Sequence, residues 1–435
     1  MKASLVISVF HALWANAQLT GPVGPTTDLS QKTHECNILD YGAANDNKTD
    51  AADAIEKTFK TCVLAHSGSR LVIPEGQYLI KRSVVLSNVA TRLLINGLTI
   101  INRKHTAIDS IILSLTWVLA VDFEFFSKNG KGAIQGQGYI YRNLANTFRP
   151  RLVRLISPIG TAVHDLILVD SPKFHIVFDF AENLEVYHLT IRGANLGSYD
   201  GVDVVGTNYW IHDIEVTNRD ECVSVKSPSN HAPVENLVCN QAGSGISIGS
   251  LNVSASIANI HARNISIIQG NNIAFIKTYP GGSGYVSNIT FENFRSKASL
   301  YGLDINQYWQ NTFEPDTGAI ALTNLVFKNF SGSVGDGAKR PPLFLVANDL
   351  RFATNITVED FSLWTESGTF IVNKIGNIFG HGDNSYGGAD GIKSLTSGQS
   401  PTPYTSTYTI TAKPTGWTAP SLPSHLGCDK HRLWH

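Results

Sequence analysis

Four carboxylic acids that could act together lie in two short segments of this 435-residue chain. Asp200 and Asp203 occupy the first segment, and Asp220 and Glu221 occupy the second, one sequence repeat later. Like charges held close together cannot all ionise easily, so at least one of these carboxyl groups should have a raised pKa. A protonated acid beside ionised carboxylates is the combination that hydrolyses glycosidic bonds. A single Asp near a strand end is more often an ordinary turn residue, and a calcium site would use the same oxygens.

A recurring sequence pattern indicates which elements position these acids. From about residue 160, an Asn or Asp is followed by an apolar residue, a polar step and another apolar residue. Repeats of roughly 20–30 residues made of short β-branched strands are typical of a solenoid. The Leu-x-x-Leu-x-Leu pattern of leucine-rich repeats is missing, and propeller blades would need ~40–45 residues. We therefore predict an all-β chain folded as a single-stranded right-handed parallel β-helix. The aligned apolar positions are 166, 189, 214, 237, 265, 289, 325 and 356.

A second set of strands lies between these apolar positions, and stacking it predicts two columns of outward-facing side chains. Equivalent residues of successive coils should lie roughly 4.8 Å apart, and the same register places Asp200 against Glu221. Two lysines beside the acids argue mildly against a calcium site. One column is Asp203, Ser224, Ser247, Phe275 and Asp304, and the next is Val205, Lys226, Gly249, Lys277 and Asn306.

Four segments on these strands carry motifs that resemble those of a known family. The segments are Ser198-Tyr199-Asp200-Gly201-Val202-Asp203, Asp220-Glu221-Cys222, Gly243-Ser244-Gly245 and Phe275-Ile276-Lys277. They resemble, in this order, the Asn-Thr-Asp-Gly-x-Asp, Asp-Asp-Cys, Gly-His-Gly and Arg-Ile-Lys motifs of glycoside hydrolase family 28, the polygalacturonase-type pectin hydrolases with a pectin-lyase-like solenoid. The resemblance covers about residues 36–370. The Asp-Glu-Cys triplet, and the serine in place of the family's His, are similar to the rhamnogalacturonan hydrolase branch.

For the acids, this resemblance implies a metal-independent, inverting acid–base hydrolysis that needs no cofactor. Asp220 would be the general acid that protonates the departing glycosidic oxygen. Asp200 and Glu221 would activate the attacking water, and Asp203 would support them. The bond cleaved would be the α-D-GalA-(1,2)-α-L-Rha linkage of rhamnogalacturonan I, in the hairy regions of pectin, and we expect endo-action.

Substrate binding and the alternatives follow from the same resemblance. Lys277 and, with less support, Lys226 would bind a galacturonate carboxylate, and Ser244 lies in the substrate-binding motif. Two alternatives stay open, a polygalacturonase acting on homogalacturonan and a non-catalytic β-helix that binds pectin. Clustered like charges in register favour catalysis, because a binding module has no need for them. A pectin or pectate lyase would use calcium or an Arg as base, and the outward columns contain no Arg.

Composition and the N-terminus fit an extracellular protein that acts on an acidic polysaccharide. Lys+Arg 34 against Asp+Glu 35 gives a net charge of −1, and without a basic block nucleic acid is not expected as a partner. Residues 1–17 have a charged start, an apolar run and a small-x-small site, which predicts a secretory signal and a mature chain from Gln18. Charges interrupt the apolar stretch 108–126, so we expect no membrane span. We predict a secreted monomer with a capped catalytic β-helix at 18–382 and a Ser/Thr/Pro/Gly-rich extension at 383–435.

Disulfides and N-linked glycans are the covalent features expected of a secreted chain. The resemblance supports one disulfide between Cys222 and Cys239, beside the acids, and another between Cys36 and Cys62 in the N-terminal cap. Cys428 would then be free or paired between molecules, and the alternative for each pair is two buried thiols. Six Asn-x-Ser/Thr sequons are candidate glycosylation sites, at Asn47, Asn252, Asn264, Asn288, Asn329 and Asn355.

Overall fold

The structure, a computed structural model, describes most of the chain. The described residues are 19–87, 94–96, 99–100, 115–144, 149–194, 197, 199–311, 317–336, 341–383 and 391–418. The predicted signal peptide, residues 1–17, and Cys428 lie outside them. No helix in this described part is long and apolar enough to cross a membrane.

Strands dominate the described chain, and helices are few and short. The helical elements are η1 (Leu29–Gln31), η2 (Ile38–Tyr41), α1 (Ala52–Thr58), η3 (Phe59–Val63), α2 (Gly138–Asn143) and η4 (Trp309–Asn311). The strands of the N-terminal half are β1 (His34–Asn37), β2 (Asp46–Asp50), β3 (Ser69–Val72), β4 (Gln77–Leu79), β5 (Val84–Leu86), β6 (Leu94–Asn96), β7 (Thr99–Ile100), β8 (Leu115–Val118), β9 (Val121–Phe126), β10 (Ala133–Gln135), β11 (Val153–Ile156), β12 (Ile159–His164), β13 (Ile167–Val169), β14 (Ile176–Tyr187) and β15 (Thr190–Arg192). The remaining strands are β16 (Val202–Thr217), β17 (Glu221–Asn240), β18 (Ser244–Leu251), β19 (Ala255–Ile268), β20 (Asn272–Thr278), β21 (Gly284–Ser299), β22 (Tyr301–Asn306), β23 (Ala321–Val334), β24 (Leu343–Val346), β25 (Ala353–Thr365), β26 (Ile371–Gly376), β27 (Ile378–Gly382) and β28 (Thr405–Ile410).

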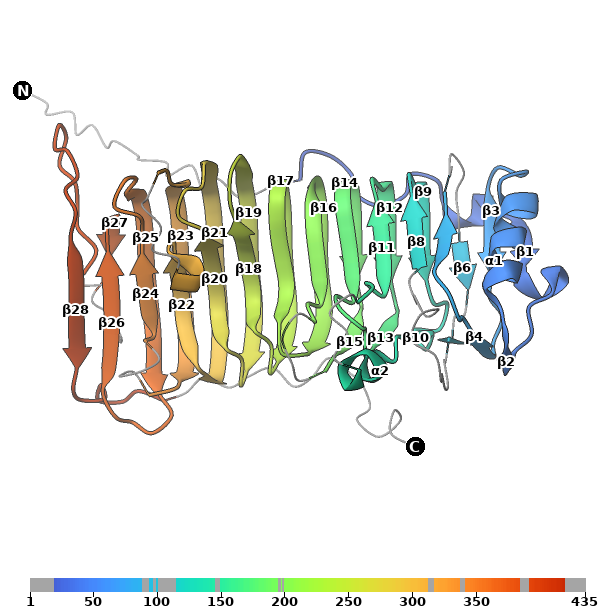
Figure 1. The fold of residues 1–435 in the computed structure, drawn as a ribbon. Coiled ribbons are helices and arrows are strands. Elements are labelled where there is room, and N and C mark those ends of the chain that lie inside the picture. The colour runs from blue at the N-terminus through green and yellow to red at the C-terminus, as the bar shows by residue number, and fades with distance from the viewer. Residues whose placement is uncertain are drawn as a thin grey trace, which may run out of the picture.

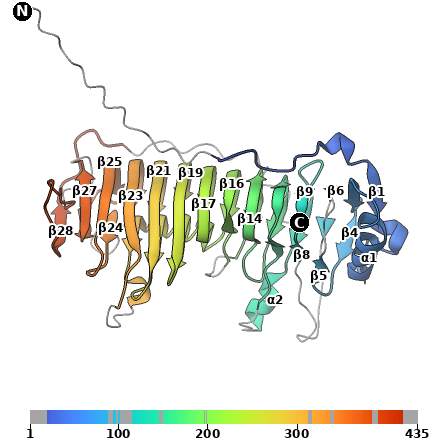
Figure 2. The same ribbon diagram turned by 90° about the horizontal axis from the view of Figure 1, so that it is seen from above.

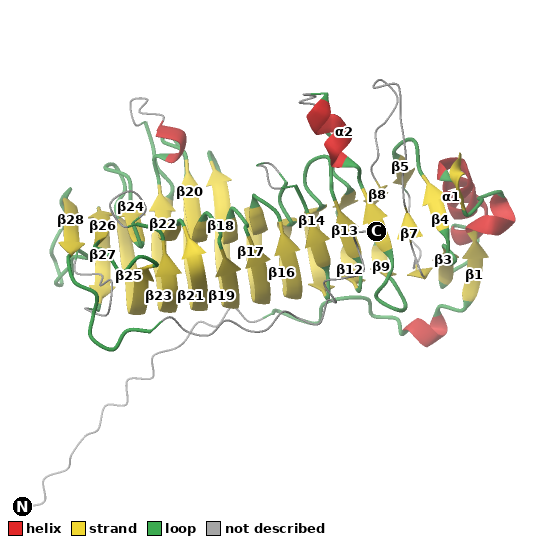
Figure 3. Cartoon of the chain, turned by 90° about the horizontal axis from the view of Figure 1, so that it is seen from below, coloured by secondary structure: helices red, strands yellow, loops and turns green. Residues whose placement is uncertain are grey.

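The strands stack in parallel, coil upon coil, in the right-handed parallel β-helix that the sequence predicts (Figure 1). α1 lies beside β1 at the N-terminal end of the stack, and β28 lies at the other end. Most connections are short loops, but α2 and η4 project from the same side of the solenoid (Figure 3). β16, β17 and β18 lie between these two projections along the stack, so the acids that begin β16 and β17 lie between them too.

Apolar side chains fill the interior of the coils in register. One inward column contains Val202, Val223, Ile246, Ala274 and Leu303, and all five are fully buried. Successive side chains of a strand point to opposite faces, so these inward residues fix which of their neighbours face outward. Burial of this column therefore sets the register of the polar column beside it.

The first predicted outward column is confirmed throughout its length. The registered pairs are Asp203 with Ser224, Ser224 with Ser247, Ser247 with Phe275, and Phe275 with Asp304. In the second column, Gly249 pairs with Lys277 and Lys277 with Asn306, as predicted. The pairing of β16 with β17 shifts register after Val204, so the predicted place of Val205 in that column is not kept.

One step in the predicted alignment of apolar positions is wrong. Ile265 pairs with Phe294, whereas Ile289 pairs with Ile260. β21 has two asparagines with positive φ, Asn288 and Asn293, but only the turn at Asn288 keeps the Asn-apolar-x-apolar pattern, because Ser296 occupies the second apolar position after Asn293. The sequence pattern therefore matched the turn at Asn264 to the turn at Asn288 instead of its true partner, the turn at Asn293.

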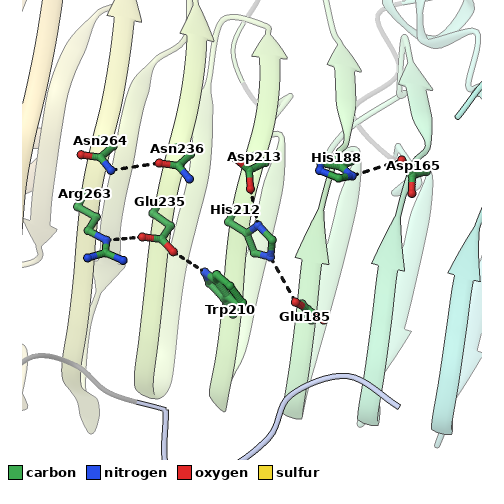
Figure 4. A network of polar contacts seen from close by, with 10 residues as sticks. All are labelled: Asp165, Glu185, His188, Trp210, His212, Asp213, Glu235, Asn236, Arg263 and Asn264. Atoms are coloured by element: carbon green, nitrogen blue, oxygen red, sulfur yellow. Dashed lines mark hydrogen bonds and ion pairs between the residues drawn. The ribbon is translucent and has the colours of Figure 1, made fainter. Parts of the chain in front are cut away.

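Asparagine side chains at these turns hydrogen-bond from coil to coil. Asn264 Nδ2 donates to Asn236 Oδ1 over 3.1 Å (Figure 4), and Asn293 Nδ2 donates to Asn264 Oδ1 over 3.2 Å. Asn236 and Asn264 both have a φ of 57°, a left-handed conformation that Asn tolerates better than most residues. The ladder explains why Asn or Asp introduces the repeated sequence pattern.

The first described residues form a strap across several coils (Figure 2). The Thr20 N–H donates to Asn208 Oδ1 over 2.7 Å, and the Thr27 N–H donates to Asp122 Oδ1 over 3.0 Å. The strap therefore joins β16 to β9. At the other end, β28 lies within the predicted extension 383–435 and pairs antiparallel with β26.

Candidate active site

The four acids Asp200, Asp203, Asp220 and Glu221, called the acid cluster below, meet where β16 and β17 begin. Asp200 lies two residues before β16, Glu221 is the first residue of β17, and the Gly201 N–H donates to the Glu221 carbonyl oxygen over 2.8 Å. One oxygen each of Asp200, Asp220 and Glu221 lies within 4.8 Å of the others. Asp200, Asp203 and Glu221 are only 3%, 4% and 5% exposed. The structure therefore brings the four predicted acids together in a largely buried group.

Two members of the acid cluster hold their protons more tightly than an ordinary Asp. Burial raises the pKa of Asp200 well above its usual range, and the charges of Asp203, Glu221 and Asp220 raise it further. Burial also raises the pKa of Asp203, against the opposing effects of the Lys226 charge and a hydrogen bond with Asp200. The expectation of at least one raised pKa is confirmed.

Glu221 has the opposite behaviour. Burial alone would raise the pKa of Glu221, but a hydrogen bond with Asp220 and the charge of Lys277 lower it to about 2. A hydrogen bond between two carboxyl groups needs one proton, so Asp220 is the donor when Glu221 is ionised. The Glu221 N–H also donates to Asp220 Oδ1 over 3.1 Å. When Glu221 is ionised, the pair shares one proton, with Glu221 as the acceptor.

Both lysines predicted to bind substrate are engaged with protein groups. Lys277 forms an ion pair with Glu221, and both side chains are nearly buried. Lys226 Nζ donates to the Gly249 carbonyl oxygen over 2.9 Å. Burial lowers the pKa of Lys226, but the charge of Asp203 and of the other acids outweighs this and raises it. A substrate carboxylate would have to compete with Glu221 for Lys277.

Several polar atoms in the acid cluster, at the start of β18 and on the outward column are buried without a hydrogen-bond partner among the described residues. Buried polar groups in folded proteins are nearly always paired, so such atoms point to a missing ligand or water. They lie within the acid cluster and on the coils that follow it. They are Asp203 Oδ1, Ser244 Oγ, Ser247 Oγ and Asp304 Oδ1. Ser244, predicted in the substrate-binding motif, is therefore placed with the acids.

Three cations on the N-terminal side of the acid cluster were not anticipated from the sequence. Arg149 donates to the Tyr199 hydroxyl over 2.6 Å, and its guanidinium lies 4.9 Å from the ring centroid. Arg151 and Lys173 lie 5.8 Å and 4.9 Å from the centroid of Phe174. The charge of Arg151 acts on the pKa of an acid in the cluster, which places it nearby. Arg149 and Arg151 precede β11, and Lys173 lies in the connection between β13 and β14, so only their charge could have indicated them.

Two aromatic residues lie on the C-terminal side of the acid cluster. Phe275 and Trp309 meet edge to face with ring centroids 5.0 Å apart, and we call this pair the aromatic corner. Lys277 Nζ lies 5.2 Å from the Phe275 ring and 5.1 Å from the Trp309 ring. The same ammonium group that pairs with Glu221 therefore touches both rings. Trp309, in η4, was not anticipated from the sequence.

Buried polar groups fix the backbone that carries the acids. His175 is fully buried, and its Nδ1 lies 2.9 Å from the Asp200 carbonyl oxygen. Asn218 Nδ2 donates to the Glu221 carbonyl oxygen over 3.2 Å. These contacts hold the two strand ends in place, so the acids above them are positioned before any ligand binds.

Both predicted disulfides are confirmed. Cys222 and Cys239 are bonded, with Cα atoms 6.0 Å apart, directly after the acid pair at the start of β17. Cys36 and Cys62 are bonded at the N-terminal end, with Cα atoms 5.8 Å apart. The bonded cysteines are 17 residues apart in the first pair and 26 residues apart in the second.

Two groups among the described residues bring metal-binding atoms together. One contains His34, Cys36 and Cys62, but its two sulfurs are bonded to each other, which leaves one nitrogen. The other lies in the acid cluster, where Lys226 and Lys277 already supply positive charge. The arrangement of acids and lysines therefore suits proton transfer better than coordination of a cation.

The six predicted glycosylation sequons lie in three kinds of surroundings. Asn252 is exposed, beside Val253, which is 67% exposed. The side-chain oxygen of Asn47 is buried without a partner among the described residues. The other four use their side-chain amides in coil-to-coil ladders, and they are Asn264, Asn288, Asn329 and Asn355.

A second polar network lies on the later half of the long strands (Figure 4). His212 lies 2.7 Å from Asp213 and 3.4 Å from Glu185, and Trp210 Nε1 donates to Glu235 over 2.9 Å. Burial lowers the pKa of His212, but its hydrogen bonds with the two carboxylates raise it overall. The groups in this network are paired with one another, unlike the polar atoms beside the acid cluster.

Comparison with known proteins gives three findings. The model of the family described as Glycosyl hydrolases family 28 matches residues 65–378. The chain is 40% identical over 420 residues to the probable rhamnogalacturonase A of Aspergillus niger, covering 96% of this chain and 90% of that protein. It is also 40% identical over 414 residues to rhamnogalacturonase A of Aspergillus aculeatus, covering 94% of this chain and 89% of that protein.

Solved structures share the fold at lower sequence identity. The endo-xylogalacturonan hydrolase of Aspergillus tubingensis superimposes with a TM-score of 0.64 at 23% identity, covering 77% of this chain and 94% of that one. The exopolygalacturonase of Thermotoga maritima has a TM-score of 0.64 at 16% identity, covering 92% of this chain and 97% of that one. At these identities, the likeness establishes the fold alone.

Proposed function

The chain belongs to glycosyl hydrolases family 28 and is a glycoside hydrolase, and we propose that it cleaves rhamnogalacturonan I by endo-attack on α-D-GalA-(1,2)-α-L-Rha bonds. The curated relatives named rhamnogalacturonases support this substrate, since the matches extend over nearly the whole chain. The predicted signal and the two disulfides support secretion. The substrate would be the acidic polysaccharide itself, with no cofactor and no second protein.

The hydrogen-bonded pair of Asp220 and Glu221 is the observation that carries the proposed mechanism. Asp220 holds the shared proton and would donate it to the departing glycosidic oxygen. Glu221 is the acid that stays ionised, so it would accept a proton from the attacking water. Asp200, with its raised pKa, would orient that water, while the negative charge passes from Glu221, which gains a proton, to Asp220, which gives one up. Asp203 would support the acid cluster through its interaction with Lys226, whose positive charge opposes the effect of burial on the pKa of Asp203.

The stereochemistry is proposed from the family resemblance. Inverting enzymes typically hold their two carboxyl groups ~6.5–9.5 Å apart, and retaining enzymes ~5–5.5 Å apart. The 4.8 Å limit here refers to single oxygens of Asp200, Asp220 and Glu221 and not to the separation of their carboxyl groups, so inversion is proposed from the resemblance and not from spacing. NMR of the first product anomer decides between the two. A β-anomer from the α-linked substrate supports inversion, and an α-anomer overturns that part of the mechanism.

Product analysis on two purified substrates tests the proposed function. Chromatography should show oligosaccharides released from rhamnogalacturonan and little release from homogalacturonan. Release from homogalacturonan alone would establish a polygalacturonase, and release from neither would favour a non-catalytic pectin-binding protein. Intermediate lengths early in the digest support endo-action, whereas a single short product from the start would indicate exo-action.

Substitution of the acid tests its role. Asp220→Asn should reduce kcat by about 10²–10⁴-fold, the range typical of general acid catalysis, with substrate binding retained. Asp213→Asn is the matched control, because Asp213 lies in the second polar network and has a positive φ that Asn accepts. Near-normal turnover by Asp220→Asn would overturn the assignment of the acid.

A further inference from the structure

The two sides of the acid cluster differ in charge. Arg149, Arg151 and Lys173 lie on the N-terminal side, and none of them belongs to an ion pair among the described residues. On the C-terminal side, Lys277 contacts the aromatic corner and is ion-paired with Glu221. A negatively charged sugar therefore meets cations outside ion pairs on the N-terminal side, whereas Lys277 on the C-terminal side is already paired.

The C-terminal side of the acid cluster also contains apolar aromatic rings. Phe275 lies in the outward column, one strand spacing beyond Ser247, and is 4% exposed beneath Trp309. Trp309 is half-buried and comes from η4, one of the two segments that project from this side of the solenoid (Figure 3). Because Lys277 contacts both rings and Glu221, the aromatic corner adjoins the acid cluster directly.

One polar side chain, Asp304, lies beside the aromatic corner. Asp304 pairs in register with Phe275, and its Oδ2 accepts from Asn272 Nδ2 over 3.0 Å. Its Oδ1 is buried without a partner among the described residues. Burial raises the pKa of Asp304 to about 8, so the carboxyl group is protonated and neutral under acidic and neutral conditions. A neutral carboxyl group can both donate and accept a hydrogen bond with a sugar hydroxyl.

We propose that Phe275, Trp309 and Asp304 form a subsite for a neutral 6-deoxyhexose, the rhamnose unit beside the bond that is cleaved. The inference rests on the proposed function and names the group that would select this substrate. The methyl group of the deoxyhexose would pack against the aromatic corner, and a ring hydroxyl would bond to Asp304. A uronate in the same place would bury an unpaired charge, which is costly, whereas on the other side it meets Arg151.

Kinetics on oligosaccharides of defined length tests the subsite. Hexasaccharides of rhamnogalacturonan and of homogalacturonan are compared for wild type, Phe275→Arg, Phe275→Leu and Trp309→Ala. Phe275→Arg should lower kcat/KM on rhamnogalacturonan about 10- to 200-fold, the range for a one-group mismatch in an apolar pocket. In an Asp220→Asn background, it should also bind the homogalacturonan hexasaccharide more tightly. Trp309→Ala should raise KM on rhamnogalacturonan more than it lowers kcat.

Two control variants separate selectivity from folding. Phe275→Leu keeps this position neutral and apolar, so it should retain the preference for rhamnogalacturonan at reduced activity. Val85→Arg adds the same charge in the same outward column, four coils before Asp203, and should leave the preference unchanged. Melting temperatures identify any variant that fails to fold. If Phe275→Arg does not fold, Trp309→Ala, at a half-buried position, still tests the subsite.

The outcomes distinguish this inference from the proposed function. If wild type does not cleave rhamnogalacturonan, the proposed function fails and the subsite fails with it. If wild type cleaves rhamnogalacturonan but folded Phe275→Arg and Trp309→Ala keep its preference and KM, only the subsite is overturned. A loss of rhamnogalacturonan cleavage with a gain in homogalacturonan binding supports both.

Discussion

Replacing Lys277 by Met removes the charge that is paired with Glu221 while preserving the length of the side chain. Burial raises the pKa of Glu221, but the Asp220 hydrogen bond and Lys277 together lower it from 4.5 to about 2. That difference corresponds to about 3 kcal/mol. Lys277 contributes a charge and a hydrogen bond, after the Asp220 hydrogen bond, so we assign to it about half, roughly 1–2 pH units.

The pH dependence of kcat should therefore move in a defined direction. If Glu221 must be ionised to act as the base, the acid limb of the kcat profile should rise by at least about one pH unit in Lys277→Met. The assay is hydrolysis of a rhamnogalacturonan hexasaccharide at saturation between pH 2.5 and 7. kcat is used because KM would also report any direct contact between Lys277 and the substrate.

Stability should change with pH in the corresponding sense. The pKa of Glu221 is lower in the folded than in the unfolded protein, so its ionisation stabilises the fold above pH 4.5 and this stabilisation is lost as the pH falls toward 2. Lys277→Met should lower the free energy of unfolding at pH 6 by about 2 kcal/mol, and the difference should shrink at pH 2.5. Lys374→Met, which removes a cation stacked on Phe344 further along the column of Phe275 and Asp304, is the control. A folded Lys277→Met enzyme with an unchanged acid limb would refute the role of Glu221 as the ionised base.

Three further predictions concern parts of the molecule away from the acid cluster. Asp122→Ala removes the acceptor of two strap N–H groups, so it should lower the free energy of unfolding by about 1–3 kcal/mol and expose the strap to limited proteolysis. His212→Phe keeps the ring stack but removes a group whose raised pKa stabilises the fold below pH 6.5, an effect that is lost at higher pH. The melting temperature should therefore fall more at pH 5 than at pH 8, and an equal fall at both pH values would contradict this. Glycopeptide mapping of the secreted protein should find a glycan at Asn252 and none at the four ladder sequons, whose amides are already hydrogen-bonded; full occupancy of a ladder asparagine would show that the ladder forms without it.

The fold could be predicted because its physical cause is repeated along the chain. Each coil needs inward apolar residues at alternate positions and a turn residue that accepts a positive φ, and both leave a periodic trace in the sequence. The same periodicity explains the error at Ile265, since its true partner turn has Ser296 at an apolar position while the neighbouring turn at Asn288 keeps the full pattern. The predicted register along a column is correct where the inward residues are all apolar, because shifting a strand by one residue would expose those residues to solvent.

The candidate site could be predicted only in part. The acids were found because two of them occupy equivalent positions in successive repeats, so register alone brings them together. The pairing of Lys277 with Glu221 depends on side-chain direction across two coils, which periodicity does not specify. Arg151 and Trp309 lie on segments outside the repeat, so their distance from the acids depends on loop conformation and could not be predicted from spacing.

The contrast between the two polar faces of the solenoid locates the site on physical grounds independent of relatives. In the network around His212, each carboxylate has a partner on its own or a neighbouring coil, so the face is complete without a ligand (Figure 4). In the outward column, by contrast, Asp203 and Asp304 each keep a buried oxygen without a partner among the described residues. Leaving such groups unpaired costs about 1–3 kcal/mol each, a cost that a bound ligand removes by pairing them. The hydroxyl groups of a bound polysaccharide would supply these partners. Asp203, at one end of this part of the column, belongs to the acid cluster.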